Sequence, residues 1–152
     1  MTSYILPAAA LCLALAGCGG APDTPGAKAA HARHENFEAI GKAFKTIGDE
    51  LKKGAPDLAA IQAQAATVHR LAPQVKDWFP AGSGPQDGVK TDALAAVWQQ
   101  PDEFGKAAAR LTDASAALDA AAQAGDLAAV RGAVPPLGAA CKGCHERFRE
   151  KD

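Results

Sequence analysis

Sulfur-bearing and aromatic side chains are scarce in this chain of 152 residues. It contains one methionine, four cysteines and only 5% aromatic residues. β-Branched residues are sparse as well, and no segment alternates apolar with polar residues in the way that a half-buried strand does. The scarcity of β-branched residues and the lack of alternation argue against a β-rich fold. Together with the abundance of alanine, they predict an all-α domain.

An excess of either charge is also missing. The 16 Lys and Arg residues are balanced by 17 Asp and Glu residues, so the formal net charge is −1 at pH 7. Proteins bind nucleic acids and anionic surfaces through clusters of their own positively charged side chains. The balance therefore predicts that nucleic acid is not among the partners of this protein.

Charged residues are absent from residues 1–17, where Tyr4 to Ala16 form an apolar run. The run is shorter than the roughly 20 residues of a membrane-spanning helix, but it has the length of the apolar region of a secretory signal. It ends in Leu15-Ala16-Gly17-Cys18, which resembles a bacterial lipobox. The resemblance implies that residues 1–17 are a lipoprotein signal peptide and that Cys18 becomes the lipidated first residue. An ordinary signal peptide with an unmodified Cys18 is the alternative.

The location predicted from this signal is the periplasm, with the protein anchored to a membrane through Cys18. The residue directly after the cysteine is Gly19 and not an aspartate. By resemblance to enterobacterial sorting, this slightly favours the outer membrane. Residues 18–30 are rich in Gly, Ala and Pro. We expect them to form a flexible tether, because such a segment cannot bury a core. Pro22 and Pro25 argue against an additional helix there.

Residues 31–152 are long enough for one domain with its own core. The first helix is predicted from His31 to Lys53, because core-type residues recur there at three- and four-residue steps. Gly41 and Gly48 lie beside this stripe, where they would let another helix or a flat ring come close. The stripe consists of Arg33, Phe37, Ile40, Phe44, Ile47 and Leu51.

Three further helices are expected. Asp57 is a candidate N-cap of the second helix, Pro101 marks the start of the third, and Asp126 caps the fourth. A glycine-rich loop over residues 80–90 separates the second from the third. Pro135-Pro136 fall within the fourth helix and should kink or break it. The pattern predicts an antiparallel four-helix bundle that holds its cofactor between helices.

The fourth helix carries Cys141-Lys142-Gly143-Cys144-His145. C-x-x-C-H is the attachment motif of c-type haem: the two thiols add to the vinyl groups, and the histidine is offered to the iron. A structural zinc or dithiol site is the alternative, but no second C-x-x-C or H-x₃-H motif is present to complete a zinc site. The motif therefore predicts one covalently bound haem c per chain, held by the four-helix domain of residues 31–152.

Other segments support a family assignment. Glu-Arg-Phe-Arg follows the motif near the C-terminus, and Arg33 lies near the start of the first helix. Three further segments match in the same way: Phe79-Pro80-Ala81-Gly82-Ser83, Ala96-Val97-Trp98 and Pro101-Asp102-Glu103-Phe104. With these features the chain resembles the cytochrome c′ family, the class II c-type cytochromes. Because members of that family often dimerise, a homodimer is one state open to this chain.

The resemblance implies roles for individual residues. Cys141 and Cys144 would form the thioether bonds, and His145 would be the proximal iron ligand. Arg33 would pair with a haem propionate, since a guanidinium suits a carboxylate. Arg149, four residues after His145 and on the same helical face, would lie beside the proximal imidazole. For either arginine the alternative is a solvated surface charge.

The opposite side of the iron decides the function. By resemblance, one branch of the family has methionine four residues after the arginine and makes low-spin electron carriers. The other branch has an apolar residue there and leaves the iron five-coordinate. Here that position is Phe37, and the only methionine is Met1, within the signal peptide. We therefore expect a protein that binds nitric oxide or carbon monoxide at an open iron position and that is not an enzyme.

Two rival functions follow from the same residues. A histidine such as His34 would, as sixth ligand, give a low-spin cytochrome that exchanges electrons with a redox partner protein of a respiratory chain. A helical lipoprotein whose C-x-x-C-H carries no haem is the other rival. The visible spectrum of the purified protein separates all three.

Overall fold

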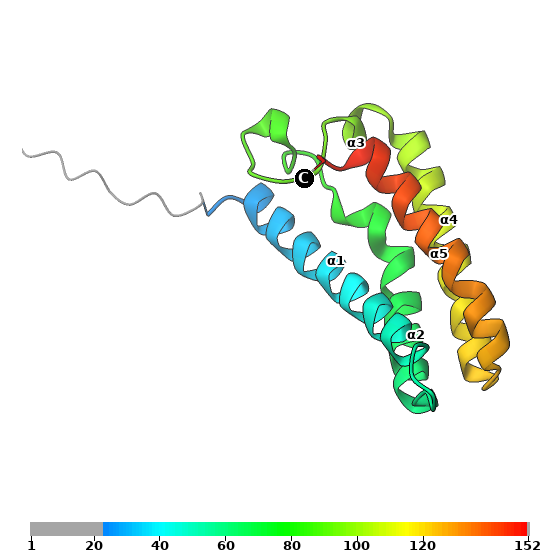
Figure 1. Cartoon of the computed structure of the whole chain (residues 1–152). Helices are drawn as coiled ribbons and strands as arrows, with labels where there is room; N and C mark the ends of the chain where they lie inside the picture. The colour runs from blue at the N-terminus through cyan, green and yellow to red at the C-terminus, as the bar shows by residue number, and fades with distance from the viewer. Residues whose placement is uncertain (1–22, 152) are drawn as a thin grey trace, which may run out of the picture.

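A computed structural model describes residues 23–151, and helices account for most of them (Figure 1). The predicted signal peptide, residues 1–17, the lipidation site Cys18 and the first part of the predicted tether lie outside the described residues. Within residues 23–151 there is no β-strand, only an isolated bridge between Ala93 and Arg149. The elements in chain order are α1 (Pro25–Glu50), α2 (Leu58–Leu71), η1 (Ala72–Trp78), η2 (Pro85–Asp87), α3 (Ala96–Gln99), α4 (Pro101–Gln123) and α5 (Leu127–Phe148).

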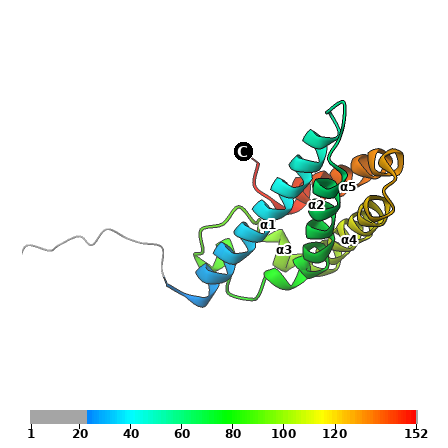
Figure 2. The same cartoon turned by 90° about the horizontal axis from the view of Figure 1, so that it is seen from below.

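The four long helices form the predicted four-helix bundle. α2 packs against both α1 and α4, and α4 packs against α5. Seen from below, α1 and α2 form one neighbouring pair, and α4 and α5 form another (Figure 2). The fourth side, between α1 and α5, has few contacts between the two helices. A bundle packed on three sides in this way leaves room for a cofactor along its fourth side.

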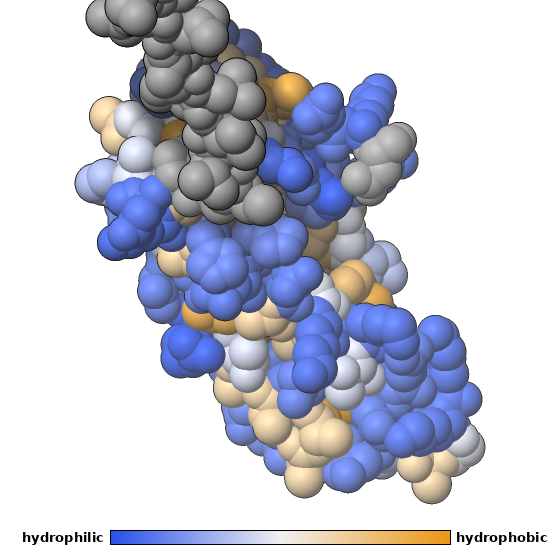
Figure 3. Space-filling view, turned by 90° about the vertical axis from the view of Figure 1, so that its left-hand side faces the viewer, coloured by the Kyte–Doolittle hydropathy of each residue, from blue (hydrophilic) through white to orange (hydrophobic). Residues whose placement is uncertain are grey.

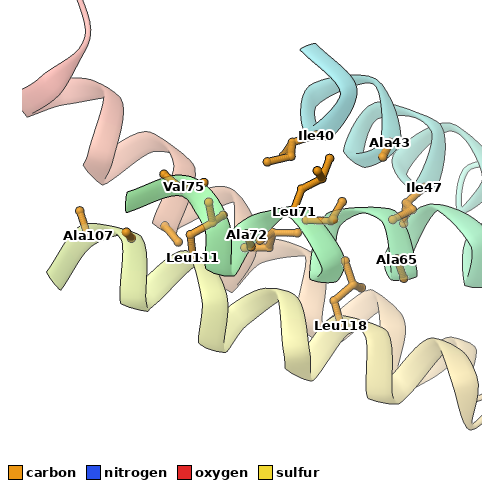
Figure 4. Close-up of a cluster of buried hydrophobic side chains, with 14 of the residues drawn as sticks. Ile40, Ala43, Ile47, Ala65, Leu71, Ala72, Val75, Ala107, Leu111 and Leu118 are labelled. Atoms are coloured by element: carbon orange, nitrogen blue, oxygen red, sulfur yellow. The ribbon is translucent and has the colours of Figure 1, made fainter. Parts of the chain in front are cut away.

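The hydrophobic core lies where α1, α2, η1 and α4 converge (Figure 4). Ile47 of α1 and Leu118 of α4 are fully buried there, as is Val75 of η1. These residues belong to the three- and four-residue steps of their helices, which place them on one face. The same core includes Val130 and Leu137 of α5, so it holds all four long helices together.

Side-chain caps define three of the helix starts. Thr24 accepts a hydrogen bond from the Ala27 N–H at 3.1 Å, and Asp57 accepts one from Ala60 at 3.1 Å. Asp126 accepts from both Ala128 and Ala129, at 3.0 and 2.9 Å. Each cap satisfies backbone donors that the first helical turn leaves without partners. The caps at Asp57 and Asp126 were predicted, whereas the cap at Thr24 was not.

The first helix begins earlier than the sequence predicted. α1 starts at Pro25, so residues 25–30 are helical and do not belong to a flexible tether. Proline is well suited to the first helical position, because its missing N–H would have no partner there. Gly26 also lies directly against the Gly82 carbonyl of the loop before η2. This contact holds the first turn on the body of the domain.

The expected break at Pro135-Pro136 does not occur. α5 is continuous from Leu127 to Phe148, with both prolines inside it. The prolines are exposed, while Val130 and Leu137 on either side of them are fully buried. Packing of those two residues keeps the helix in register, and solvent can reach the backbone carbonyls that lose a donor.

None of the helices within residues 23–151 is long and apolar enough to cross a membrane.

Candidate functional site

A cavity of about 480 Å³ lies between α1, α4 and α5. Its size falls within the range of small-molecule and cofactor sites, roughly 300–1,000 Å³. Apolar side chains form most of its wall, while polar groups gather at two places, on α5 and at one end of α1. The apolar wall includes Phe37, Ile40, Phe44, Val97, Phe104, Ala108 and Leu111.

The α5 wall of the cavity carries the three residues of the attachment motif. Cys141, Cys144 and His145 all line the cavity. Cys144 and His145 follow Cys141 by three and four residues, which places all three on one side of the helix. The structure thus brings the two thiols and the imidazole together on one wall, as C-x-x-C-H in a helix requires.

Both thiols are neutral in this environment. Burial raises the pKa of the Cys141 thiol. Burial, and secondarily the nearby Cys141, raises the pKa of Cys144 to about 11. Within residues 23–151, no three His, Cys, Asp or Glu side chains are grouped closely enough to hold a metal ion. Both thiols line the cavity, where an organic group could bond to them.

His145 is neutral for a related reason. The residue is exposed overall, but the protein atoms around its imidazole desolvate it in part, which lowers its pKa. The positive charge of Arg149 lowers that pKa further. A neutral imidazole keeps a lone pair on one ring nitrogen, which is the form that ligates metals.

Arg33 is buried at the end of the cavity, with 3% of its surface exposed. Its Nη1 donates to Ser83 Oγ at 2.9 Å, and its Nη2 donates to the Ser83 carbonyl and to Thr91 Oγ1, both at 2.7 Å. The guanidinium carbon also lies 4.9 Å from the ring centre of Phe79 and 5.6 Å from that of Trp98. Arg33 is therefore no solvated surface charge, and it lines the cavity from α1. Its pairing with a haem propionate stays a prediction.

Phe37 also lines the cavity from α1, on the other side from the α5 motif. Its ring packs edge-on against Trp78 with centroids 5.1 Å apart, and it lies 6.2 Å from Phe79. Edge-to-face packing of this kind fixes the position of an aromatic ring. Phe37 thus places a fixed apolar group, with no atom that can ligate iron, at the position singled out in the sequence.

Arg149 is the residue that caps α5, and its N–H still donates to the His145 carbonyl at 3.1 Å, while its predicted place beside the imidazole stays a prediction. α5 ends at Phe148, and Arg149 has an extended backbone with φ −119° and ψ 142°. Its backbone belongs to a short pairing with the segment before α3: Leu94 N–H donates to the Phe148 carbonyl at 2.9 Å, and Glu150 N–H donates to the Asp92 carbonyl at 2.7 Å. The Arg149 side chain still lines the cavity and affects His145.

Several residues at the site were not identified from the sequence as functional. Thr91 gave no signal, because its role depends on Arg33, 58 residues earlier. Ser83 was part of a matching loop, but its bond to Arg33 could not be read from that match. Gly41 and Phe44 were placed on or beside the α1 stripe, and the structure adds that they line the cavity.

The donor set fits a covalently attached haem. A mostly apolar cavity suits the macrocycle, the two neutral thiols on its wall would form the thioether bonds, and the neutral imidazole of His145 would ligate the iron. A buried arginine at the cavity end can accept a carboxylate as a partner. These features come from residues 33–149, which is nearly the whole of the described domain.

Comparison with known proteins finds one matching family, together with similar sequences and similar solved structures. The family described as Cytochrome C' matches residues 28–149. Cytochrome c-554 of Cereibacter sphaeroides is 34% identical over 122 residues, which cover 79% of each chain. Cytochrome c' of Pararhodospirillum photometricum is 37% identical over 119 residues, covering 78% of this chain and 93% of its own. A solved nitric oxide complex of a variant of cytochrome c prime from Alcaligenes xylosoxidans is 28% identical, covers 84% of this chain and 97% of its own, and has a TM-score of 0.75.

Proposed function

This chain belongs to the cytochrome c′ family, with haem c as its cofactor, and we propose that it binds nitric oxide or carbon monoxide at an open coordination position of the haem iron. Cys141 and Cys144 would hold the haem, and His145 would ligate the iron from α5. When bound, the haem supplies an iron with one position for a small neutral ligand. The protein is then a binding protein rather than an enzyme.

One observation carries this proposal: Phe37 lines the cavity wall opposite the α5 motif, and the chain offers no methionine in its place. The only methionine is Met1, outside the described residues. Phe37 is also fixed by Trp78, so it keeps that wall apolar. An apolar wall favours ligands that need no hydrogen bond, which is why nitric oxide and carbon monoxide are preferred over dioxygen. The nitric oxide complex solved for the cytochrome c prime from Alcaligenes xylosoxidans supports the same choice.

A low-spin electron carrier is the second candidate, because His34 also lines the cavity. Its imidazole is on α1, three residues before Phe37. The side chain is 61% exposed, however, and its Nε2 lies 3.3 Å from Glu38 Oε1. Ligation of iron would require His34 to leave that partner and turn inward. In this alternative the protein would deliver electrons to a redox partner protein.

The visible spectrum of the purified haem protein tests both functions. The proposed function predicts a high-spin ferrous spectrum in dithionite that shifts when nitric oxide or carbon monoxide is added. Sharp low-spin α and β bands before any gas is added would contradict it and support the electron carrier. The variant His34→Ala is the control, and it should leave the high-spin spectrum unchanged. Absence of a Soret band would leave only a haem-free helical lipoprotein.

We also propose that the protein is anchored in the periplasm through a lipid on Cys18, with the outer membrane slightly favoured. The support comes from the sequence of residues 1–19 alone. Cell fractionation with and without detergent tests it: the wild type should sediment with membranes, and Cys18→Ser should be soluble. A wild-type protein that is already soluble would contradict the anchor and leave the haem site unaffected.

A further inference from the structure

The early start of α1 leaves a short connection between the predicted lipidation site and the folded domain. α1 begins at Pro25, seven residues after Cys18, whereas the sequence predicted a tether that runs to residue 30. A fully extended chain advances at most about 3.6 Å per residue, so Pro25 lies within roughly 25 Å of a lipid attached through Cys18. Gly26 lies directly against the Gly82 carbonyl. The first turn of α1 is therefore part of the domain and does not lengthen the connection.

The start of α1 belongs to one end of the domain, which we call the tether end. It consists of the first turn of α1, residues 80–94 and residues 149–151. Hydrogen bonds join these parts: Arg33 Nη2 donates to Thr91 Oγ1 at 2.7 Å, and Glu150 N–H donates to the Asp92 carbonyl at 2.7 Å. Figure 1 shows the start of α1, the loop that contains η2 and the C-terminus at the same end of the bundle.

The opposite end of the domain, which we call the turn end, holds residues 51–57 and 124–126. These residues join α1 to α2 and α4 to α5. α1 has 26 residues, and a helix rises 1.5 Å per residue, so the two ends are separated by about 39 Å along α1. That separation exceeds the reach of the connection at Pro25. The two ends of the domain can therefore be told apart by their distance from a membrane.

The tether end also carries an exposed apolar side chain. Leu94 is 38% exposed, and no other large hydrophobic side chain of residues 23–151 is as exposed. A single exposed leucine on a protein surface is ordinary. This one, however, lies on the end that a lipid at Cys18 would bring to the membrane, where burial of apolar area strengthens binding.

The surface charges of the domain are compatible with the same orientation. The long side on which α1 lies is largely covered by hydrophilic residues, so it gains little by lying flat on lipid (Figure 3). The tether end has no excess of either charge, so an anionic lipid surface does not repel it. In residues 80–94 and 149–151, three positive side chains balance three negative ones: Lys90, Arg149 and Lys151 against Asp87, Asp92 and Glu150.

We propose that the tether end rests on the membrane surface, with Leu94 in contact with lipid, and that the turn end points away from the membrane. This inference rests on the proposed lipid anchor at Cys18. It places one end of the cavity beside the lipid headgroups, because Arg33 lines the cavity and is bonded to Ser83 and Thr91 of the tether end. The membrane then binds a defined surface of the domain in addition to the lipid on Cys18.

Spin labels on introduced cysteines test this orientation. The full-length protein, lipidated and loaded with haem, is reconstituted into vesicles of phosphatidylethanolamine and phosphatidylglycerol. The measurement is the relaxation of the label by a nickel-chelating lipid, compared with vesicles that lack nickel. Ala81→Cys labels the tether end, and Ala55→Cys is the matched position at the turn end, since both alanines are exposed and lie outside the helices. Circular dichroism and the Soret band confirm that each variant is folded and loaded.

We expect nickel at the headgroups to relax the label at position 81 and to have no effect at position 55. Leu94→Ser, added to Ala81→Cys, should reduce the effect of nickel while the lipid anchor is still in place. An unchanged effect in Leu94→Ser would overturn the contact of Leu94 with lipid. Equal relaxation at both positions, or none at position 81 in a vesicle-bound protein, would overturn the orientation while the anchor and the haem function stand. A wild-type protein that does not bind vesicles would overturn the anchor together with the orientation.

Discussion

Ser83 holds the guanidinium of Arg33 with two of its oxygens, although the two residues are 50 positions apart. The Ser83 hydroxyl accepts from Nη1 at 2.9 Å, and the Ser83 carbonyl accepts from Nη2 at 2.7 Å. Both residues are buried, and the Ser83 hydroxyl donates in turn to the Pro80 carbonyl at 2.8 Å. The pair therefore ties α1 to the loop between η1 and η2 at the end of the cavity.

Removing the Ser83 hydroxyl should destabilise the domain. Ser83→Ala leaves a buried charged donor without one acceptor, which costs about 1.5–3 kcal/mol for a hydrogen bond to a charged group. Urea denaturation gives this free energy of unfolding. Ser115→Ala is the control, since Ser115 is equally buried but bonds only to Thr112 of its own helix, at 2.8 Å. Equal losses in the two variants would show that Ser83 holds Arg33 no more strongly than an ordinary bond within a helix.

Replacing Phe37 with methionine should change the spin state of the haem. In Phe37→Met a flexible thioether lies on α1 at the position where the low-spin branch of the family has its ligand. We expect sharp low-spin α and β bands in the ferrous protein and a loss of carbon monoxide affinity. Phe37→Leu keeps the wall apolar and should remain high-spin. A high-spin spectrum in Phe37→Met would mean that position 37 cannot reach the iron.

A side chain at Gly26 should loosen the start of α1. A β-carbon there would run into the Gly82 carbonyl oxygen and come within 3.3 Å of Val89. Such overpacking costs about 1–3 kcal/mol, so Gly26→Ala should lower the unfolding free energy although alanine favours helices. Gly48→Ala, with open space at its β-carbon, should instead raise it by about 0.5–1 kcal/mol. A stabilised Gly26→Ala variant would place residues 25–30 off the body of the domain, as a tether would be.

Glu50 should make the domain sensitive to acid. The carboxylate accepts from Lys53 Nζ at 2.5 Å and from the Asp57 N–H at 3.1 Å. The bond from Lys53, and after it the Asp57 N–H, holds the pKa of Glu50 below its ordinary value of 4.5. A lowered pKa stabilises the fold fully above the unfolded value, and this contribution is lost as pH falls from 4.5 through the folded pKa.

Denaturation at a series of pH values checks this. Glu50→Gln should be less stable than the wild type near neutrality, and its stability should fall less steeply below pH 4.5. Glu35→Gln removes an exposed carboxylate of the same helix, whose Oε1 lies 3.5 Å from Nε2 of the exposed His31. Such a surface pair contributes little to stability. Its acid profile should follow that of the wild type. Parallel profiles for Glu50→Gln and the wild type would contradict a role for Glu50.

Much of the chemistry of this site is local, and for that reason the sequence determined it. Cys141, Cys144 and His145 lie within five residues of one another, so helical spacing alone places them on one face. The helical content and the caps at Asp57 and Asp126 follow from patterns over a few residues. The absence of a methionine at position 37 needs no structure at all.

The remaining features depend on contacts between distant residues, and only the tertiary structure decided them. The first turn of α1 lies on the body of the domain because Gly26 meets Gly82, and α5 runs through Pro135-Pro136 because its flanking residues are buried. Arg33 finds its partners 50 and 58 residues away. Such contacts form after the helices pack, so no short stretch of sequence records them.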